Sequence, residues 1–283
     1  MNLDPSAVPP VLRLEPIGER RYAVQNEGDA TTRNVVFGGQ LLAQTIMAAA
    51  AHSPDKTVKT ISIIFARSGR VDAPTEIDVE TFHSGRTFAS HTISAWQGDR
   101  LCSRALVLTH AHEPDLITHQ SDMPVLAPAH GEPVSDNAAF PGAEYVIADG
   151  VDLIDSSAPI GPAELAVWYR SPQTPDHPLV NQAVLAWGTD GFLIGTAMRP
   201  HAGVGYDRAH LDLSTGVIGH TLTFHRPFSM RDWVLMSHES PFAGGGRSYG
   251  RCHIHDTTGT LVASYVQDNM IREMPAGMEH KRM

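Results

Sequence analysis

The chain has 283 residues, of which 42% are hydrophobic, and a formal net charge of −10 at pH 7. This hydrophobic fraction suffices for a substantial core, and the length predicts one large domain or two ordinary ones. The acidic balance, without a cluster of Lys and Arg residues, argues against nucleic acid as the main partner. No apolar run approaches the roughly 18 residues that a membrane span requires.

The N-terminal residues and the two cysteines bear on where the protein works. The stretch "MNLDPSAVPPVLRLEP" has neither a basic start nor an apolar segment, so it does not match a signal peptide. Cys102 and Cys252 lie in strand-like runs, and two cysteines do not make a disulfide framework. We therefore expect a cytoplasmic protein with two reduced, buried thiols.

The predicted elements occur twice along the chain in the same order. A helix-like run, "GGQLLAQTIMAAAAHS" from Gly38, precedes strand-like runs such as "TEIDVETFHS", "TFASHTISAWQ" and "RLCSRALVLTHA". A second helix-like run, "HPLVNQAVLAWGTDGFLIGTAM" from His177, again precedes strand-like runs. The first helix has little polar coverage, so we expect protein to enclose it on most sides.

The two copies also align residue by residue. Residues 63–67 fall on residues 222–226 at an offset of 159, and "GRTF" from Gly85 falls on "GRSY" from Gly246 at an offset of 161. At the second offset, Gln267 in "LVASYVQDNMIR" falls on Leu106 of the first copy. An amide therefore stands where the first copy has an apolar residue, and we interpret Gln267 as a functional exception to the strand pattern.

These elements predict an α+β fold in which each copy curls an antiparallel sheet around one long helix. We place an N-terminal unit at residues 1–118 and a C-terminal unit at residues 165–283. Residues 119–164 are rich in Pro, Gly, Ala and Asp and show no sustained periodicity. They predict a linker that runs over the surface.

Two features at helix ends are candidates for a site. Gly38 and Gly39 would let a carbonyl oxygen or an anion approach the free N–H donors of the first helix, although they equally suit tight packing of a helix on a sheet. Asp190, in "LAWGTDGFL", has apolar neighbours, and a carboxylate is costly to bury there without a partner. It would suit a general base, or it could be a cap or turn residue beside Gly191.

Other motifs predict structure rather than chemistry. His253 and His255 share one face of a strand, but no third ligand accompanies them, so we predict no metal site. The run "GGGRS" lacks the Lys and the following helix of a phosphate loop, and it aligns with a hairpin turn. Arg247 in this turn could still reach a phosphate group. No pattern of a serine or cysteine nucleophile is present.

Five segments together resemble the type II acyl-CoA thioesterases, the TesB-like family, in order and nearly in spacing. They are "VFGGQLLAQ" from Val36, "HQSDMP" from His119, "TDGFL" from Thr189, "HTLTFHRPF" from His220 and "GTLVASYVQDNMIR" from Gly259. The resemblance covers most of the chain and implies a double hotdog fold. It also implies an acyl-CoA substrate, hydrolysis of fatty acyl-CoA to free acid and CoA without a cofactor, metal or covalent intermediate, and a homo-oligomer.

The resemblance further implies a site in which an Asp, a Ser or Thr, and a Gln activate a water molecule. Asp190 and Gln267 match the first and last of these residues. The expected hydroxyl position, three residues before His220, holds Val217, and Thr215 on the same strand face is a possible substitute.

The remaining expectations concern residues that contact the substrate and two rival functions. By analogy, Gly38, Gly39, Gln40 and Arg247 would contact the substrate. Because Val217 replaces the hydroxyl, the alternative is a catalytically weakened acyl-CoA-binding protein of the same fold. A hotdog hydratase acting on enoyl-CoA ranks last, because it would need a His paired with Asp190 on one helix, and none is visible near Asp190.

Overall fold

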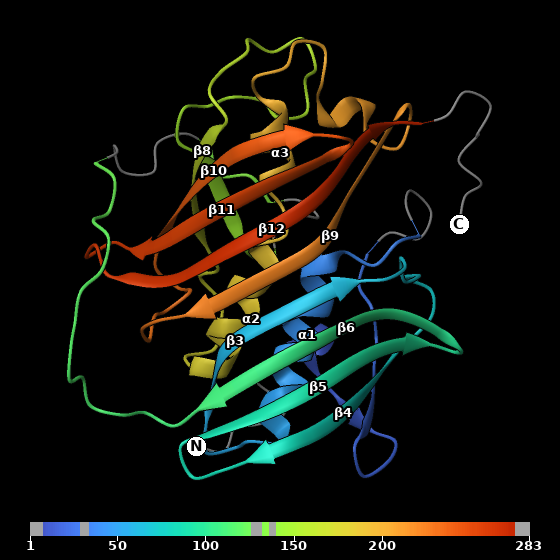
Figure 1. Ribbon diagram of the computed structural model, residues 1–283, viewed down its shortest axis with the longest axis vertical. Helices are drawn as coiled ribbons and strands as arrows, with labels where there is room; N and C mark the ends of the chain where they lie inside the picture. The colour runs from blue at the N-terminus through green and yellow to red at the C-terminus, as the bar shows by residue number, and fades with distance from the viewer. Residues whose placement is uncertain (1–7, 29–33, 126–131, 136–139, 275–283) are drawn as a thin grey trace.

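The alternating runs of the sequence form one antiparallel sheet of 12 strands, which curves over a pair of helices (Figure 1). The computed structural model describes residues 8–28, 34–125, 132–135 and 140–274. Within these residues, no helix is long and apolar enough to cross a membrane. The sheet order is β1-β2-β4-β5-β6-β3-β9-β12-β11-β10-β8-β7.

The elements have the following bounds. The strands are β1 (Glu15–Pro16), β2 (Arg21–Val24), β3 (Thr57–Phe65), β4 (Thr75–Ser84), β5 (Phe88–Gln97), β6 (Arg100–His110), β7 (Glu144–Ile147), β8 (Glu164–Arg170), β9 (Leu213–Phe224), β10 (Val234–Gly244), β11 (Arg247–Asp256) and β12 (Leu261–Glu273). The α-helices are α1 (Gly38–Ala51), α2 (Pro178–Gly188) and α3 (Leu193–Met198), and short 3-10 helices lie at Pro10–Leu12 and Tyr206–Arg208.

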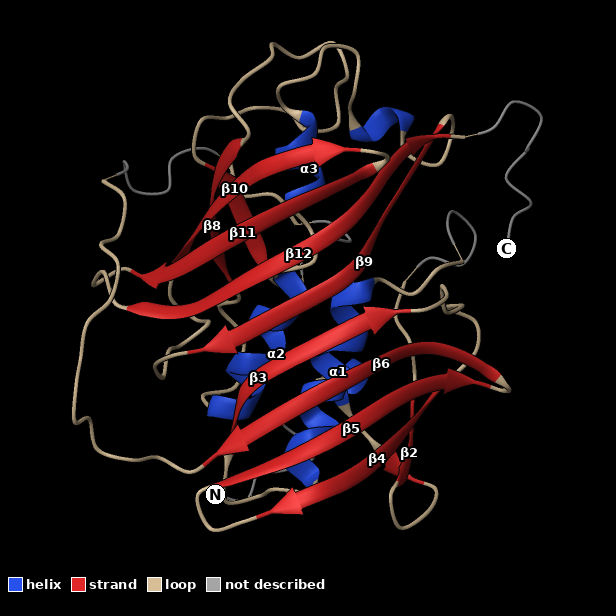
Figure 2. Ribbon diagram, in the orientation of Figure 1, coloured by secondary structure: helices blue, strands red, loops and turns tan. Residues whose placement is uncertain are grey.

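The two copies meet at the centre of the sheet, where β3 and β9 lie side by side (Figure 2). Ser62 pairs with Thr221, and these residues hold the same position in the two copies at the offset of 159. Their hydroxyl oxygens lie 2.9 Å apart. On either side the strands follow in the same order, β3-β6-β5-β4 and β9-β12-β11-β10. The chain therefore repeats one unit about an approximate two-fold axis.

The strand pairing corrects one part of the sequence alignment. Gln267 pairs with His220, and the corresponding pair in the first copy is Val107 with Ile61. Leu106, the predicted counterpart of Gln267, points outward instead and is 59% exposed. Between equivalent strand pairs, the β5–β6 turn has four residues (97–100) and the β11–β12 turn has five (256–260), so β6 and β12 match at an offset of 160 rather than 161, and this difference of one residue exchanges the two strand faces.

The second helix also differs from the prediction, because the single expected run is broken into α2 and α3. The turn at residues 189–192 separates them. Thr189 Oγ1 donates a hydrogen bond of 2.7 Å to the Ala186 carbonyl, and the Gly191 N–H donates to the Gly188 carbonyl, so the end of α2 closes on itself. The break places Asp190 just beyond α2, where its side chain is not confined to a helix face.

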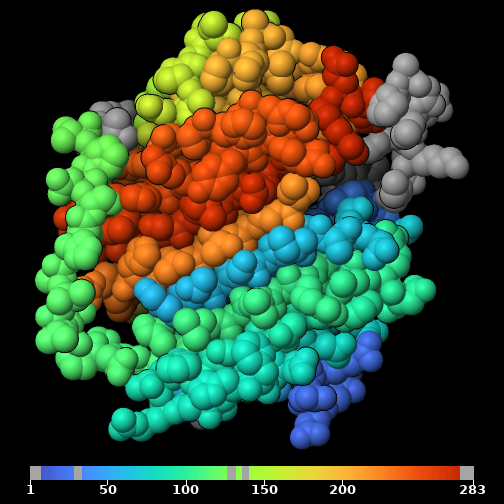
Figure 3. Space-filling model, viewed as in Figure 1, coloured from blue at the N-terminus to red at the C-terminus, as the bar shows by residue number. Residues whose placement is uncertain are grey.

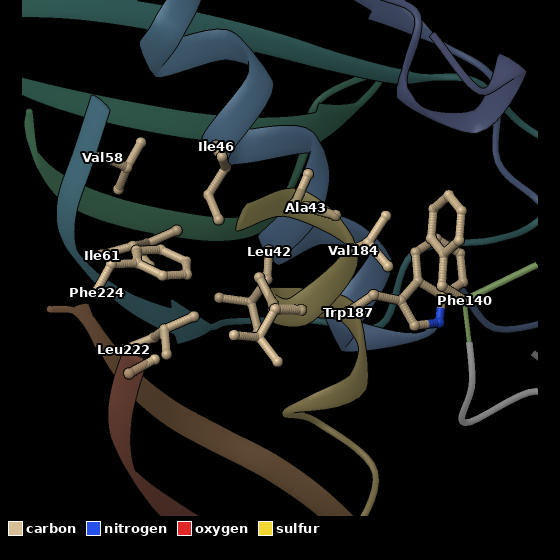
Figure 4. Packing of buried hydrophobic residues seen from close by; sticks show 14 of the residues in the cluster. Leu42, Ala43, Ile46, Val58, Ile61, Phe140, Val184, Trp187, Leu222 and Phe224 are labelled. Atoms are coloured by element: carbon tan, nitrogen blue, oxygen red, sulfur yellow. The ribbon is translucent and has the colours of Figure 1, made fainter. Parts of the chain in front are cut away.

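Helices α1 and α2 pack against each other beneath the sheet. Figure 4 shows part of this core, including Leu42 of α1, Val184 of α2 and Leu222 of β9, all of them fully buried. The helices approach closely at Gly39, where a Cβ atom would overlap the backbone oxygen of Trp187. The glycine that opens α1 is thus required for the approach of α2.

The segment predicted as a linker binds the surface of the C-terminal strands. Residues 111–125, the green strap in Figure 3, run along the edge of the sheet from the first copy to the second. The Gln120 side chain donates to the Gly259 carbonyl at 2.7 Å and accepts from the Leu261 N–H at 3.1 Å. Further along, β7 pairs with β8 and extends the sheet by one strand.

The Gly39→Ala substitution should lower the free energy of unfolding by about 1–3 kcal/mol, because the new methyl group would overlap backbone that cannot rotate away. Urea denaturation measures this change. The matched control is Gly216→Ala in β9, where a Cβ would meet no heavy atom within 4 Å. Equal stability of the two variants would contradict the described helix contact.

Candidate active site

Asp190 is the charged centre of a buried polar cluster between the two copies. Its side chain follows the end of α2, and the residue is only 8% exposed. Asp190 Oδ2 accepts a hydrogen bond of 3.1 Å from the Gly39 N–H at the start of α1. Asp190 Oδ1 accepts one of 3.3 Å from Gln267 Nε2 on β12. The carboxylate therefore joins the N-terminal helix to the C-terminal sheet, and it lies where the α1 dipole stabilises negative charge.

Gln267 uses both of its N–H donors inside the protein. One N–H goes to Asp190, and the other goes to His220 Nδ1 at 3.0 Å. The residue is 1% exposed, and its Oε1 atom has no hydrogen-bond partner among the described residues. A buried carbonyl oxygen without a donor is costly, so this atom is poised to accept a hydrogen bond from a water molecule or a ligand.

His220 of β9 pairs with Gln267 across the sheet. It is 2% exposed, and its Nε2 atom lies 3.2 Å from Thr189 Oγ1. Burial lowers the pKa of His220 from 6.5 to about 3, so the imidazole is neutral near pH 7. A neutral His220 adds no charge to the site, in which Gln267 also contacts the Asp190 carboxylate.

Tyr265 and His238 support His220 from the side. The His220 and Tyr265 rings are stacked, with centroids 5.0 Å apart and planes inclined by 13°. His238 Nδ1 donates to the Leu165 carbonyl at 3.1 Å, so its Nε2 accepts the Tyr265 hydroxyl proton at 2.8 Å. Burial raises the pKa of Tyr265 and lowers that of His238 to about 4. These neutral contacts fix the position of the imidazole.

Of the predicted substrate-binding residues, only the two glycines reach Asp190. A Cβ at Gly38 would come within 2.6 Å of Asp190 Oδ2, so this position must be glycine for the carboxylate to fit. Gln40 is buried but turns the other way, and its Oε1 accepts the Glu27 N–H at 2.8 Å. Arg247 is exposed at the start of β11, and its Nη1 donates to the Gly246 carbonyl. The structure does not bring Gln40 or Arg247 together with Asp190.

The predicted substitute hydroxyl, Thr215, also lies away from the cluster. Gln267 pairs with His220, whereas Thr215 pairs with Ile271, which lies four residues further along β12. At about 3.3 Å per residue this is roughly 13 Å. Val217 pairs with Asn269 and therefore occupies the pair between them. A bulge follows Val217, but it does not move Thr215 beside Gln267.

The remaining motifs are structural. Gly245 and Gly246 both have positive φ, 58° and 74°, and form the hairpin turn between β10 and β11 that was predicted for "GGGRS". His253 Nδ1 lies 2.9 Å from the Ser121 hydroxyl, and His255 Nε2 lies 3.2 Å from the Ser121 carbonyl. In the described part of the chain, no group of three or more His, Cys, Asp or Glu residues could hold a metal ion.

Models of protein families match both copies of the repeat. The model described as "Acyl-CoA thioesterase C-terminal domain" matches residues 122–271, and "Acyl-CoA thioesterase N-terminal domain" matches residues 26–110. The chain belongs to the acyl-CoA thioesterase family. Among curated proteins, acyl-CoA thioesterase 2 of Haemophilus influenzae is 28% identical over 93% of this chain and 96% of its own length. Mouse acyl-coenzyme A thioesterase 8 is 27% identical, over 96% of this chain and 90% of its own length.

Solved structures agree with this thioesterase assignment. The chain is similar to the acyl-CoA thioesterase II TesB2 of Mycobacterium marinum, with a TM-score of 0.76, 26% identity, and coverage of 94% of this chain and 98% of the other. A protein of Alicyclobacillus acidocaldarius described as having a hot dog fold matches with a TM-score of 0.72 and 18% identity, covering 93% and 97% of the two chains. With the repeated unit described above, the predicted double hotdog fold is confirmed.

His220 and Thr189 are the members of this thioesterase's polar cluster that the sequence did not identify. Both stand inside quoted motifs, "HTLTFHRPF" and "TDGFL", but neither received a role. A signal was present, because His220 falls on Ile61 of the first copy. Gln267 falls on Val107 in the same way. Two paired polar residues thus replace two paired apolar residues, and only the strand pairing makes that visible.

His220 should make the stability of this thioesterase depend on pH. The unfolded chain binds a proton on this histidine below about pH 6.5, whereas the folded chain binds it only near its lowered pKa of about 3. The stability contributed by His220 is therefore complete above pH 6.5. It falls as the pH decreases toward 3, by up to about 1.4 kcal/mol per pH unit. We expect His220→Asn to lose this part of the slope.

Urea denaturation of the wild type and His220→Asn at pH 7, 6 and 5 measures the two slopes directly. The comparison uses slopes, so a uniform loss of stability in the variant does not affect it. Parallel slopes for the two proteins would contradict the neutral, buried state described for His220.

Proposed function

We infer that this chain is an acyl-CoA thioesterase that hydrolyses fatty acyl-CoA to the free acid and CoA. The observation that carries this proposal is the Asp190 carboxylate, which is held by the Gly39 N–H and by Gln267 Nε2 while Gln267 Oε1 remains without a donor. A carboxylate and an amide oxygen side by side can bind the two protons of one water molecule. Membership in the acyl-CoA thioesterase family supplies the substrate class.

We propose Asp190 as the general base. Asp190 Oδ2 accepts from the Gly39 N–H and Asp190 Oδ1 accepts from Gln267 Nε2, and the two oxygens of a carboxylate can together accept about four hydrogen bonds. Gln267 Oε1 would accept a hydrogen bond from the second O–H of the water. The two hydrogen bonds would direct a lone pair of the water oxygen toward the substrate. Because the Gln267 N–H groups are both occupied, this amide cannot also donate to the thioester carbonyl.

The reaction then proceeds in two steps. The water oxygen forms a bond to the thioester carbonyl carbon while its proton moves to Asp190, which gives a tetrahedral intermediate. The intermediate collapses as the carbon–sulfur bond breaks, and the departing CoA sulfur takes the proton from Asp190. Asp190 thereby returns to its ionised form, and neither a metal ion nor an acyl-enzyme is needed.

The start of α1 would stabilise the oxyanion of that intermediate. The Gly39 N–H is taken by Asp190, so it is not the free donor that the sequence suggested. The Gly38 N–H has no hydrogen-bond partner among the described residues, and Gly38 is partly exposed beside Asp190. A free N–H at the positive end of a helix suits a developing negative charge. We therefore assign the oxyanion contact to Gly38.

Val217, which stands at the expected hydroxyl position, is the reason for the alternative of acyl-CoA binding without hydrolysis. No hydroxyl of β9 stands beside Gln267, since Val217 and Thr215 occupy the next two inward pairs. The proposed mechanism does not require one, because Asp190 and Gln267 together supply both acceptors for the water. We propose that hydrolysis proceeds without the third residue of the family pattern.

We also propose the organisation in which this reaction takes place. Residues 1–118 and 165–283 form the two units, with residues 119–164 joining them, and both units contribute to the site through Gly39 and Asp190. Ile64 and Leu106 are exposed on the outer sheet face, which supports a homo-oligomer that light scattering can measure. Buried free thiols at Cys102 and Cys252 support a cytoplasmic location.

Release of free CoA from a panel of acyl-CoA thioesters tests the proposed function. We expect the wild type to release CoA, and Asp190→Asn to lower kcat by about 10²–10⁴-fold through loss of the base. Gln267→Ala should also lower kcat, because the water loses one acceptor. Saturable acyl-CoA binding with turnover at the uncatalysed rate would establish the binding protein instead.

Thr215→Val is the matched control for these variants, since it removes a side-chain polar group from the same strand face about 13 Å away from Gln267. We expect kcat to stay at the wild-type value. A kcat in Thr215→Val as low as in Gln267→Ala would restore Thr215 to the site and contradict the geometry described above.

A further inference from the structure

His220 touches neither the expected position of the substrate nor Asp190, yet it is bonded to the amide that contacts Asp190. Its Nδ1 atom accepts from Gln267 Nε2 at 3.0 Å, and its Nε2 atom faces Thr189 Oγ1 at 3.2 Å. The side chain is buried and stacked on Tyr265. A buried, neutral imidazole that is hydrogen-bonded through both ring nitrogens has no direct role in the proposed hydrolysis.

The hydrogen-bond network determines which ring nitrogen of His220 carries the proton. The Asp190 carboxylate can only accept, so the Gln267 atom facing it must be Nε2. The same Nε2 atom faces His220 Nδ1, which must therefore be unprotonated. His220 Nε2 then carries the proton and donates to Thr189 Oγ1, whose own proton goes to the Ala186 carbonyl. Each donor in this row meets one acceptor.

We propose that His220 is a positioning residue that fixes the orientation of the Gln267 amide, so that Oε1 rather than an N–H faces the reacting water. The inference rests on the proposed hydrolytic function and deepens it. An amide rotated by 180° would place Oε1 against two acceptors, Asp190 Oδ1 and His220 Nδ1, and is therefore excluded. His220 supplies the shorter of these two restraints.

The repeat supports a joint role for His220 and Gln267. The equivalent pair in the first copy is Ile61 with Val107, both buried and apolar. A polar residue at either position alone would leave a buried group without its partner, which costs about 1–3 kcal/mol. In the next inward pair, Val217 offers no hydroxyl to the amide. Among the described side chains, Gln267 Nε2 is therefore restrained by Asp190 and His220 alone.

Steady-state hydrolysis by two His220 variants tests the positioning role. In His220→Asn the Asn Oδ1 can occupy the place of Nδ1 and accept from Gln267, whereas His220→Leu offers no acceptor. We expect His220→Leu to lower kcat by about 10–100-fold with KM nearly unchanged, the usual size of effect for a lost supporting partner. His220→Asn should recover most of this loss, which a role in packing alone would not produce.

A double-mutant cycle with Gln267→Ala shows whether His220 acts through Gln267. If it does, His220→Leu lowers kcat in the wild type but has little further effect in Gln267→Ala. If His220→Leu does not fold, His220→Gln replaces it, since the longer amide reaches Thr189 and leaves the Nδ1 position empty. His91→Leu is the matched control, because His91 is equally buried but bonds Ser53 and Thr81 in the first copy. It should lower the melting temperature and leave kcat unchanged.

The outcomes separate this proposal from the proposed function. An active wild type whose His220 and Gln267 effects on kcat multiply independently, or whose His220→Asn is as slow as His220→Leu, overturns the positioning role alone. A wild type that releases no CoA from any acyl-CoA overturns the hydrolytic function and the positioning role with it.

Discussion

The burial of one carboxylate, Asp190, organises the functional part of this molecule. A buried charge must be compensated, and two of the contacts of Asp190 come from opposite ends of the chain: the Gly39 N–H of α1 and the Gln267 amide of β12. Both compensating contacts depend on close packing. The glycine lets α2 approach α1, and the break after α2 frees Asp190 to turn toward the sheet. The fold and the site are therefore coupled through a single side chain.

The repeat explains how a symmetric scaffold carries one asymmetric site. Ser62 and Thr221 mark the axis, and the strands on either side follow in the same order. Close to that axis the second copy replaces a buried apolar pair by His220 and Gln267. The polar pair is tolerated because the N–H groups of Gln267 and His220 find acceptors, while Gln267 Oε1 is buried without a donor among the described residues.

The sequence predicted the double hotdog fold, because hydrophobic periodicity, the internal repeat and the family motifs all agreed, and the family motifs alone placed Asp190 and Gln267 in one site. It could not predict the partner of Gln267. That partner depends on the strand register, which the alignment missed by one residue when it matched Gln267 to Leu106 instead of Val107. The search for a replacement hydroxyl at Thr215 failed for a similar reason, since proximity across a sheet follows from pairing rather than from distance along one strand.

We propose that Asp190 activates water and does not itself attack the thioester. The most direct test is a single turnover in ¹⁸O-labelled water, with the enzyme in excess over acyl-CoA, followed by mass spectrometry of the acid and of the peptide that contains Asp190. We predict ¹⁸O in the fatty acid from the first turnover and none in the peptide. Unlabelled acid from the first turnover, together with ¹⁸O in the Asp190 peptide, would contradict it.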